Sequence, residues 1–100
     1  MIKHIVIFRI TGNYDKETRR RLAYELAACF SPLKEHSSVT EYKTGVNFNE
    51  SENAWDVVID SLFESRAKLE EYQVSIEHQQ AIKSAARFNK EKAVVDYELH

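Results

Sequence analysis

The chain has 100 residues, of which 43% are hydrophobic and 11% are aromatic. This length and composition predict a single domain with one core, spanning residues 1–100. Acidic and basic residues are interspersed, the net charge is −2, and no basic stripe extends beyond Arg19–Arg21. We therefore expect no nucleic-acid partner.

The sequence has no features of a disulfide-bonded, zinc-binding or membrane-inserted protein. Cys29 is the one cysteine, so no internal disulfide and no zinc spacing can form. We expect Cys29 to be a small, inert core residue. No apolar run approaches membrane-spanning length, and no secretory hydrophobic segment opens the chain. The expectation is a cytoplasmic protein with no membrane partner, no metal site and no cofactor.

Residues 2–10 show the period-two alternation of a β-strand. One face carries Ile2, His4, Val6, Phe8 and Ile10, and the other carries Lys3, Ile5, Ile7 and Arg9. Because both faces are apolar near the middle, the pattern predicts a strand that is covered on both sides.

A turn at Thr11–Asn13 precedes a predicted helix over residues 15–30, with Asn13 or Asp15 as its cap. The apolar positions recur at spacings of three and four, which predicts one buried stripe: Leu22, Ala23, Leu26, Ala27 and Phe30. Pro32 follows and ends the helix.

Two further strands are predicted, over residues 39–48 and 55–63, with a polar loop at 49–53 between them. The first alternates as a half-exposed strand, and the second has a strongly apolar centre. Asp56 and Asp60 occupy alternate positions in it, but no third metal ligand stands at a suitable spacing. We expect them to be solvent-facing or salt-bridged.

Ser65 and Ser75 are candidate caps of two consecutive helices with a break near Val74, and a last strand is predicted over residues 92–99. Asp96 in that strand is expected to pair with a basic group such as Arg9 or Lys92. The order β-α-β-β-α-β predicts a ferredoxin-like α+β fold, an antiparallel sheet with its helices on one face.

The other face of that sheet bears on assembly. It presents Ile5 and Ile7, where a sheet covered on one side only should be polar. A large exposed apolar face normally marks an interface. We therefore expect a homodimer through Ile5 and Ile7, with two sheets packed face to face as a closed barrel.

Several segments, in order and at matching spacing along nearly the whole chain, resemble the stress-responsive A/B barrel family of dimeric α+β barrel proteins. They are Lys3–Val6, Gly45, Asn49, Trp55–Asp56, Glu64–Ser65, Leu69, Tyr72, His78 and Val94–Tyr97. The resemblance implies a homodimer with a cleft between sheet and helices in each subunit.

Plant members of that family include polyketide cyclases, and the resemblance places their catalytic groups at His4, His78 and Tyr72. The implied ligand cleft is lined by His4, Val6, Phe8, Val57, Tyr72 and His78. Two departures leave this cleft poorer in acid/base groups. Ser75–His78 stands where the family commonly has His-Pro-Ala-His, and Val57 stands where the cyclases have a histidine.

Each candidate residue also has a plainer interpretation. A neutral His4 imidazole could accept a proton from a ligand, or it could be a core histidine hydrogen-bonded within the protein. His78, in a first helical turn where the dipole favours the neutral form, could be a base or a surface residue. Tyr72 could orient a ligand through its hydroxyl or only pack in the core. His36 and His100 are interpreted as loop and terminal residues.

Three functions remain open on the sequence. The first is a homodimer of unassigned activity that binds a small apolar or aromatic molecule in the cleft. The second is a cofactor-free enzyme, a polyketide-cyclase-like protein, isomerase or monooxygenase, that uses His4 and His78. The third is a structural or stress-protective dimer without a ligand, whose clefts are filled by side chains.

Overall fold

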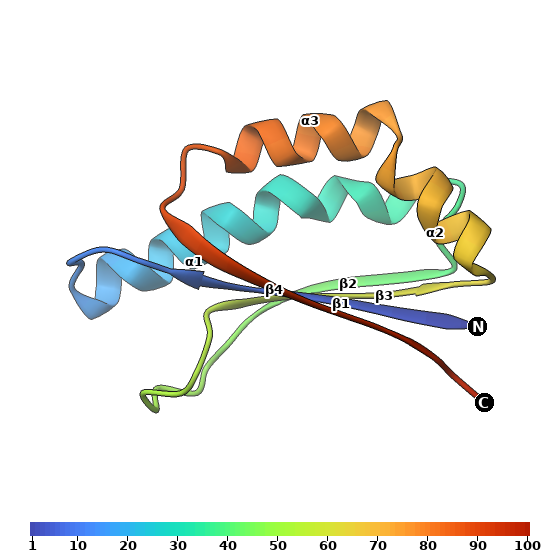
Figure 1. The fold of residues 1–100 in the computed structure, drawn as a ribbon. Helices are drawn as coiled ribbons and strands as arrows, with labels where there is room; N and C mark the ends of the chain where they lie inside the picture. Colours follow the sequence, from blue (N-terminus) through green and yellow to red (C-terminus); the bar gives the residue numbers. More distant parts are fainter.

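The computed structural model describes all residues, 1–100, as a two-layer α+β domain (Figure 1). Its elements are β1 (Ile2–Ile10), α1 (Lys16–Phe30), a 3₁₀ turn η1 (Ser31–Glu35), β2 (Glu41–Val46), β3 (Val57–Phe63), α2 (Arg66–Gln73), α3 (Ile76–Ala85) and β4 (Lys90–Glu98). The strands form one antiparallel sheet in the order β2-β3-β1-β4. All helices lie on one face of it (Figure 1). The predicted ferredoxin-like fold is confirmed.

Local sequence signals set the helix boundaries. The side chains of Asp15, Ser65 and Ser75 each accept a hydrogen bond from a backbone N–H three residues on, which satisfies a donor that the helix itself leaves free. Pro32 stands in the 3₁₀ turn that follows α1. Val74 separates α2 from α3, as predicted, and the chain changes direction between these two helices (Figure 1).

The core lies between the sheet and the helices. Along β1 every second residue from Ile2 to Ile10 is buried, and the alternate residues are half-buried. Phe8 and Phe30 stack across the two layers with ring centroids 5.3 Å apart. The alternation of the first strand therefore decides which side chains meet the helices, and His4 is among them.

The strands β2 and β3 are shorter than the predicted ranges 39–48 and 55–63. Where they adjoin the connecting loop, the backbone hydrogen bonds no longer all run between these two strands. The Asn47 N–H still donates to the Asp56 carbonyl, but the Asp56 N–H donates to the carbonyl of Phe8. The loop between the two strands projects beyond the sheet on the side opposite the helices (Figure 1).

The second face of the sheet has no layer upon it (Figure 1). On this face Ile5 stands opposite Val95, and Ile7 stands opposite Val58 and Ala93. Ile5, Ile7 and Val58 are half-buried by their neighbours, whereas Val95 is 58% exposed. We refer to this surface, with Tyr97, as the open sheet face.

Candidate functional site

A small cavity of about 70 Å³ lies between the sheet and the helices. Strands β1, β3 and β4, helices α1 and α3, and the end of α2 all contribute to it. Its lining residues are His4, Val6, Phe8, Phe30, Ile59, Tyr72, Gln73, His78, Ile82, Lys92 and Val94. The floor is apolar, and the polar groups converge on it from four separate elements, β1, α2, α3 and β4.

His4 lies in the wall of this cavity and is only 4% exposed. Its Nδ1 bonds the carboxylate of Asp96, the residue opposite it on β4. A carboxylate at Nδ1 holds the proton on that nitrogen and leaves Nε2 with a free lone pair. The protein supplies no hydrogen-bond partner to Nε2. His4 is therefore fixed in orientation and has an unused acceptor at the cavity.

The pairing of Asp96 corrects the sequence-based expectation. Arg9 binds Glu91, and Lys92 makes no ion pair with Asp96. The antiparallel register places Asp96 directly across from His4, while Lys92 is across from Phe8. The alternation of β4 alone could not show this partner, because it depends on which residue of β1 stands opposite.

Tyr72 sits at the centre of an aromatic cluster beside His4. It is 2% exposed, and its ring centroid lies 4.8 Å from that of His78 and 5.1 Å from that of Phe63. Its hydroxyl oxygen is 3.4 Å from that of Tyr42. Burial raises the pKa of both phenols. Tyr72 therefore stays a neutral hydroxyl, able to donate or accept a hydrogen bond but not to act as a phenolate.

His78 occupies the first turn of α3, where its backbone N–H donates to the Ser75 hydroxyl. Burial lowers the pKa of the His78 imidazole below its usual value, and the charge of Lys92 adds to this. The helix N-terminus acts in the same direction. His78 is thus a neutral imidazole at neutral pH, as its sequence position predicts.

The structure brings together five of the six residues predicted for the cleft, namely His4, Val6, Phe8, Tyr72 and His78. Val57 does not line it. Val57 is buried opposite Phe8, whereas Ile59, opposite Val6, lines the cavity in its place. The resemblance placed Val57 in the cleft, whereas the register of β3 against β1 sets it two residues away from the lining position that Ile59 occupies.

Sequence reasoning also missed His36. Its side chain is only 10% exposed, its ring centroid lies 5.6 Å from that of Tyr72, and its Nε2 is 3.2 Å from a Glu77 carboxylate oxygen. Its Nδ1 accepts a hydrogen bond from the Ser38 N–H. His36 is thus a packed residue that supports Tyr72 from outside the cavity. Its position after η1 carries no sequence signal for this.

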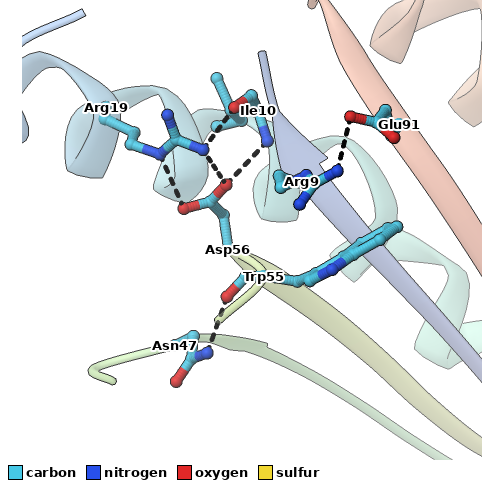
Figure 2. A network of polar contacts seen from close by, with 7 residues as sticks. All are labelled: Arg9, Ile10, Arg19, Asn47, Trp55, Asp56 and Glu91. Atoms are coloured by element: carbon cyan, nitrogen blue, oxygen red, sulfur yellow. Dashed lines mark hydrogen bonds and ion pairs between the residues drawn. The ribbon is translucent and has the colours of Figure 1, made fainter. Parts of the chain in front are cut away.

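A larger groove of about 570 Å³ lies between the N-terminal part of α1 and the β2–β3 loop. Its central feature is Asp56, whose carboxylate accepts hydrogen bonds from the Ile10 N–H and the Arg19 guanidinium (Figure 2). Lys16 pairs with Glu50 beside it. The charges of this groove largely neutralise one another within the protein, so it offers less free acid/base chemistry than the cavity at His4.

Asp56 and Asp60 do not act together. Asp56 binds α1, while Asp60 pairs with Lys3, 2.6 Å away, on the open sheet face. Both carboxylates are salt-bridged, as expected. No group of three His, Cys, Asp or Glu side chains lies close enough to hold a metal ion. None of the helices has the length and apolarity needed to cross a membrane.

This fold, with a histidine-lined cavity between its sheet and its helices, defines a ferredoxin-like α+β domain. The family described as Stress responsive A/B Barrel Domain (Dabb) matches residues 2–99, and the chain belongs to this family. No curated protein matches the sequence.

Solved structures extend the comparison. A dimeric protein of unknown function and ferredoxin-like fold from Bacteroides fragilis is 25% identical, with a TM-score of 0.81 over 98% of this chain and 95% of that one. A dimeric ferredoxin-like protein of unknown function from Thermobifida fusca is 17% identical, with a TM-score of 0.78 over 98% and 90%. An antibiotic biosynthesis monooxygenase is 14% identical, with a TM-score of 0.69 over 100% and 99%.

Proposed function

We propose that this protein is a homodimeric Dabb-domain protein that binds a small molecule in the cavity beside His4. The observation that carries the proposal is the convergence of His4, Tyr72 and His78, from three separate elements, on one apolar cavity. The Nε2 atom of His4 has no hydrogen-bond partner in the protein and is not among the fully buried unpartnered atoms, so it is open to the cavity. A ligand or an ordered water in the cavity can therefore contact it.

The size of the cavity limits what can bind. Ligand pockets usually measure about 300–1,000 Å³, whereas this one is about 70 Å³. A linear poly-β-ketone does not fit without opening the helical layer. The buried part of the ligand is therefore a few heavy atoms, the equivalent of about two water molecules in liquid volume.

The mouth of the cavity offers a test of this proposal. Ile82 lines the cavity and is 41% exposed, so an Ile82→Trp side chain would cover the mouth without disturbing the core. Val74, 66% exposed and outside the cavity, provides the matched control Val74→Trp. A panel of compounds with up to about six heavy atoms, titrated by ¹H–¹⁵N NMR, should shift the cavity resonances of the wild type and of Val74→Trp but not of Ile82→Trp. Shifts confined to the groove at Asp56, or none at all, would contradict the proposal.

The homodimer rests on the open sheet face. The accessible surface of the single chain is 6557 Å², against about 5,900 Å² expected for a monomer of 11.7 kDa. The single chain therefore exposes more surface than a compact monomer of its size, and on the open sheet face this surface includes Val95 and Tyr97, which are 58% and 45% exposed. The cavity lies on the other side of the sheet, so each subunit keeps its own.

Ile7→Lys places a charge at the centre of the open sheet face. We expect it to yield a monomer in sedimentation velocity at micromolar concentration, because a buried unpaired ammonium costs several kcal/mol. Val74→Lys, on the helical side, should leave the dimer intact. A wild-type chain that sediments as a monomer would refute the dimer, without affecting the ligand proposal.

A second candidate is a cofactor-free enzyme, favoured by the Asp96–His4 pair. A carboxylate behind a histidine is the usual arrangement of a general base, with Nε2 turned to the substrate. His4 could remove a proton next to a carbonyl group, while the Tyr72 hydroxyl binds the carbonyl oxygen. The small cavity restricts such a substrate to a few atoms.

Deuterium uptake from D₂O by 2-butanone, followed by NMR, tests this chemistry. The wild type should accelerate exchange next to the carbonyl, Asp96→Asn should weaken the effect, and His4→Gln should abolish it. Equal exchange rates with wild type and His4→Gln would dismiss the enzyme and leave the binding function as proposed.

A further inference from the structure

The rim of the cavity carries a basic side chain but no acidic one. No Asp or Glu is among its lining residues, whereas Lys92 is. Lys90, two residues earlier on β4, donates to the carbonyl of Ala85, but Lys92 takes part in none of the protein's ion pairs. The cavity therefore has a free ammonium group at its edge.

None of the acidic side chains forms an ion pair with Lys92, and the two on β4 and α3 that have a partner other than Arg or Lys are paired with histidines. Asp96 is bound to His4, and Glu77 is bound to His36. The first turn of α3 adds the positive end of its helix dipole, and His78 stands in that turn. Lys92 and His78 line the same cavity, and the charge of Lys92 contributes to lowering the pKa of His78.

The interior of the cavity, in contrast to its charged rim, is apolar. Val6, Phe8, Phe30 and Ile59 form an apolar floor, and all four are buried. Val94 and Ile82 extend this apolar surface to the mouth, where they are 46% and 41% exposed. The one polar group buried in the wall with an unused atom is the His4 imidazole, which is 5% exposed as a side chain.

We propose that the ligand of this cavity is a small monocarboxylate, with its carboxylate at Lys92 and its short alkyl chain on the apolar floor. The inference rests on the proposed function, since it names the ligand class of the same cavity. A single anionic group suffices, because one free cation is present. A chain of about three or four carbons matches the volume, and longer chains extend along Ile82 and Val94. Lys92 is then the residue that selects an acid over its neutral analogue.

Sodium butyrate and butyramide, which have the same number of heavy atoms, are the probes that separate charge from shape. Both are titrated into the full-length protein at pH 7.5 by ¹H–¹⁵N NMR. In the wild type butyrate should bind more tightly than butyramide. Lys92→Gln should weaken butyrate about three- to tenfold, the range between an exposed ion pair and a charged hydrogen bond, and should leave butyramide unchanged.

Two variants serve as controls. Lys83→Gln removes the same charge from the last turn of α3, outside the cavity, and should change neither affinity. Lys92→Arg keeps the charge and should restore preference for butyrate. As a readout that needs no ligand, Lys92→Gln should raise the pKa of His78, whereas Lys83→Gln should not.

The outcomes separate this inference from the proposed function. If butyramide binds at the cavity as tightly as butyrate, or if Lys92→Gln leaves butyrate affinity unchanged, the carboxylate assignment is wrong and the ligand-binding cavity stands. If neither probe nor any other small compound shifts the cavity resonances, the proposed function fails and the inference fails with it. An unchanged His78 pKa in Lys92→Gln would show that the ammonium does not face the cavity.

Discussion

The Asp56 carboxylate is the point at which three elements are held together, and its removal should destabilise the domain more than the loss of any exposed ion pair. It accepts a hydrogen bond of 2.7 Å from the Ile10 N–H and two of 3.1 Å from Arg19 (Figure 2). These contacts join the end of β1, the start of β3 and the N-terminal half of α1. Asp56→Ala removes all three.

The expected cost follows from the burial of the groups left behind. Ile10 is 1% exposed, so its N–H becomes a buried donor without a partner, which costs about 1–3 kcal/mol. The Arg19–Asp56 pair has side chains 34% and 18% exposed, and its loss adds about 0.5–1 kcal/mol. The total of about 1.5–4 kcal/mol corresponds to a fall in Tm of about 6–30 °C for a domain of this size.

Trp55 is the single tryptophan, and the Arg9 guanidinium carbon lies 5.0 Å from the centroid of the Trp55 ring. Because unfolding separates the two side chains, Trp55 fluorescence should report it. Urea titrations should be run at one fixed protomer concentration, because a dimer's stability depends on it. Glu91→Ala is the matched control. It breaks the Arg9–Glu91 pair, 36% and 52% exposed, and should cost at most about 1 kcal/mol. If Asp56→Ala costs no more than Glu91→Ala, the Asp56 network does not have the stabilising role assigned here.

Two smaller perturbations act on the helix that carries His78. Ser75→Ala removes the cap of α3 and should lower the free energy of unfolding by about 1 kcal/mol. Ser84→Ala, within the same helix, should change it little. Equal effects of the two substitutions in urea unfolding would show that the Ser75 cap does not stabilise the helix. Because burial lowers the pKa of folded His78 below the unfolded value of about 6.5, the unfolded state binds more protons between the two values. The free energy of unfolding should therefore fall as the pH drops through 6.5 and level off below the folded pKa. His78→Gln should flatten this part of the profile, and a slope that persists in that variant would assign it to another group.

Much of the fold was predictable because its signals are local. The alternation of residues 2–10 separated the two faces of β1, and the family resemblance placed His4 at the cavity. The caps at Asp15, Ser65 and Ser75 are short-range hydrogen bonds that a sequence displays directly. The order of the elements then left few arrangements of the sheet.

The parts of the site that escaped prediction depend on register and on contacts across the layers. Whether Val57 or Ile59 lines the cavity is decided by the pairing of β3 with β1, which alternation does not specify. Asp96 was expected to bind a cation, yet the β1–β4 register sets it opposite His4. His36 reaches Tyr72 because η1 packs against α3, a contact between segments far apart in the sequence. Tyr72 and His78 were found through family resemblance, not through any pattern of their own.

The most direct test of the ligand cavity uses the four histidines of the chain as internal probes. His4 and His78 line the cavity, while His36 and His100 do not. With ¹⁵N-labelled imidazoles, His4 should show a proton on Nδ1 and a free Nε2 before any ligand is added. Butyramide, the uncharged probe, should then shift the His4 and His78 ring signals saturably and leave those of His36 and His100 in place. A His4 protonated on Nε2, or a titration in which His4 and His78 move no more than His36 and His100, would contradict the cavity as the binding site.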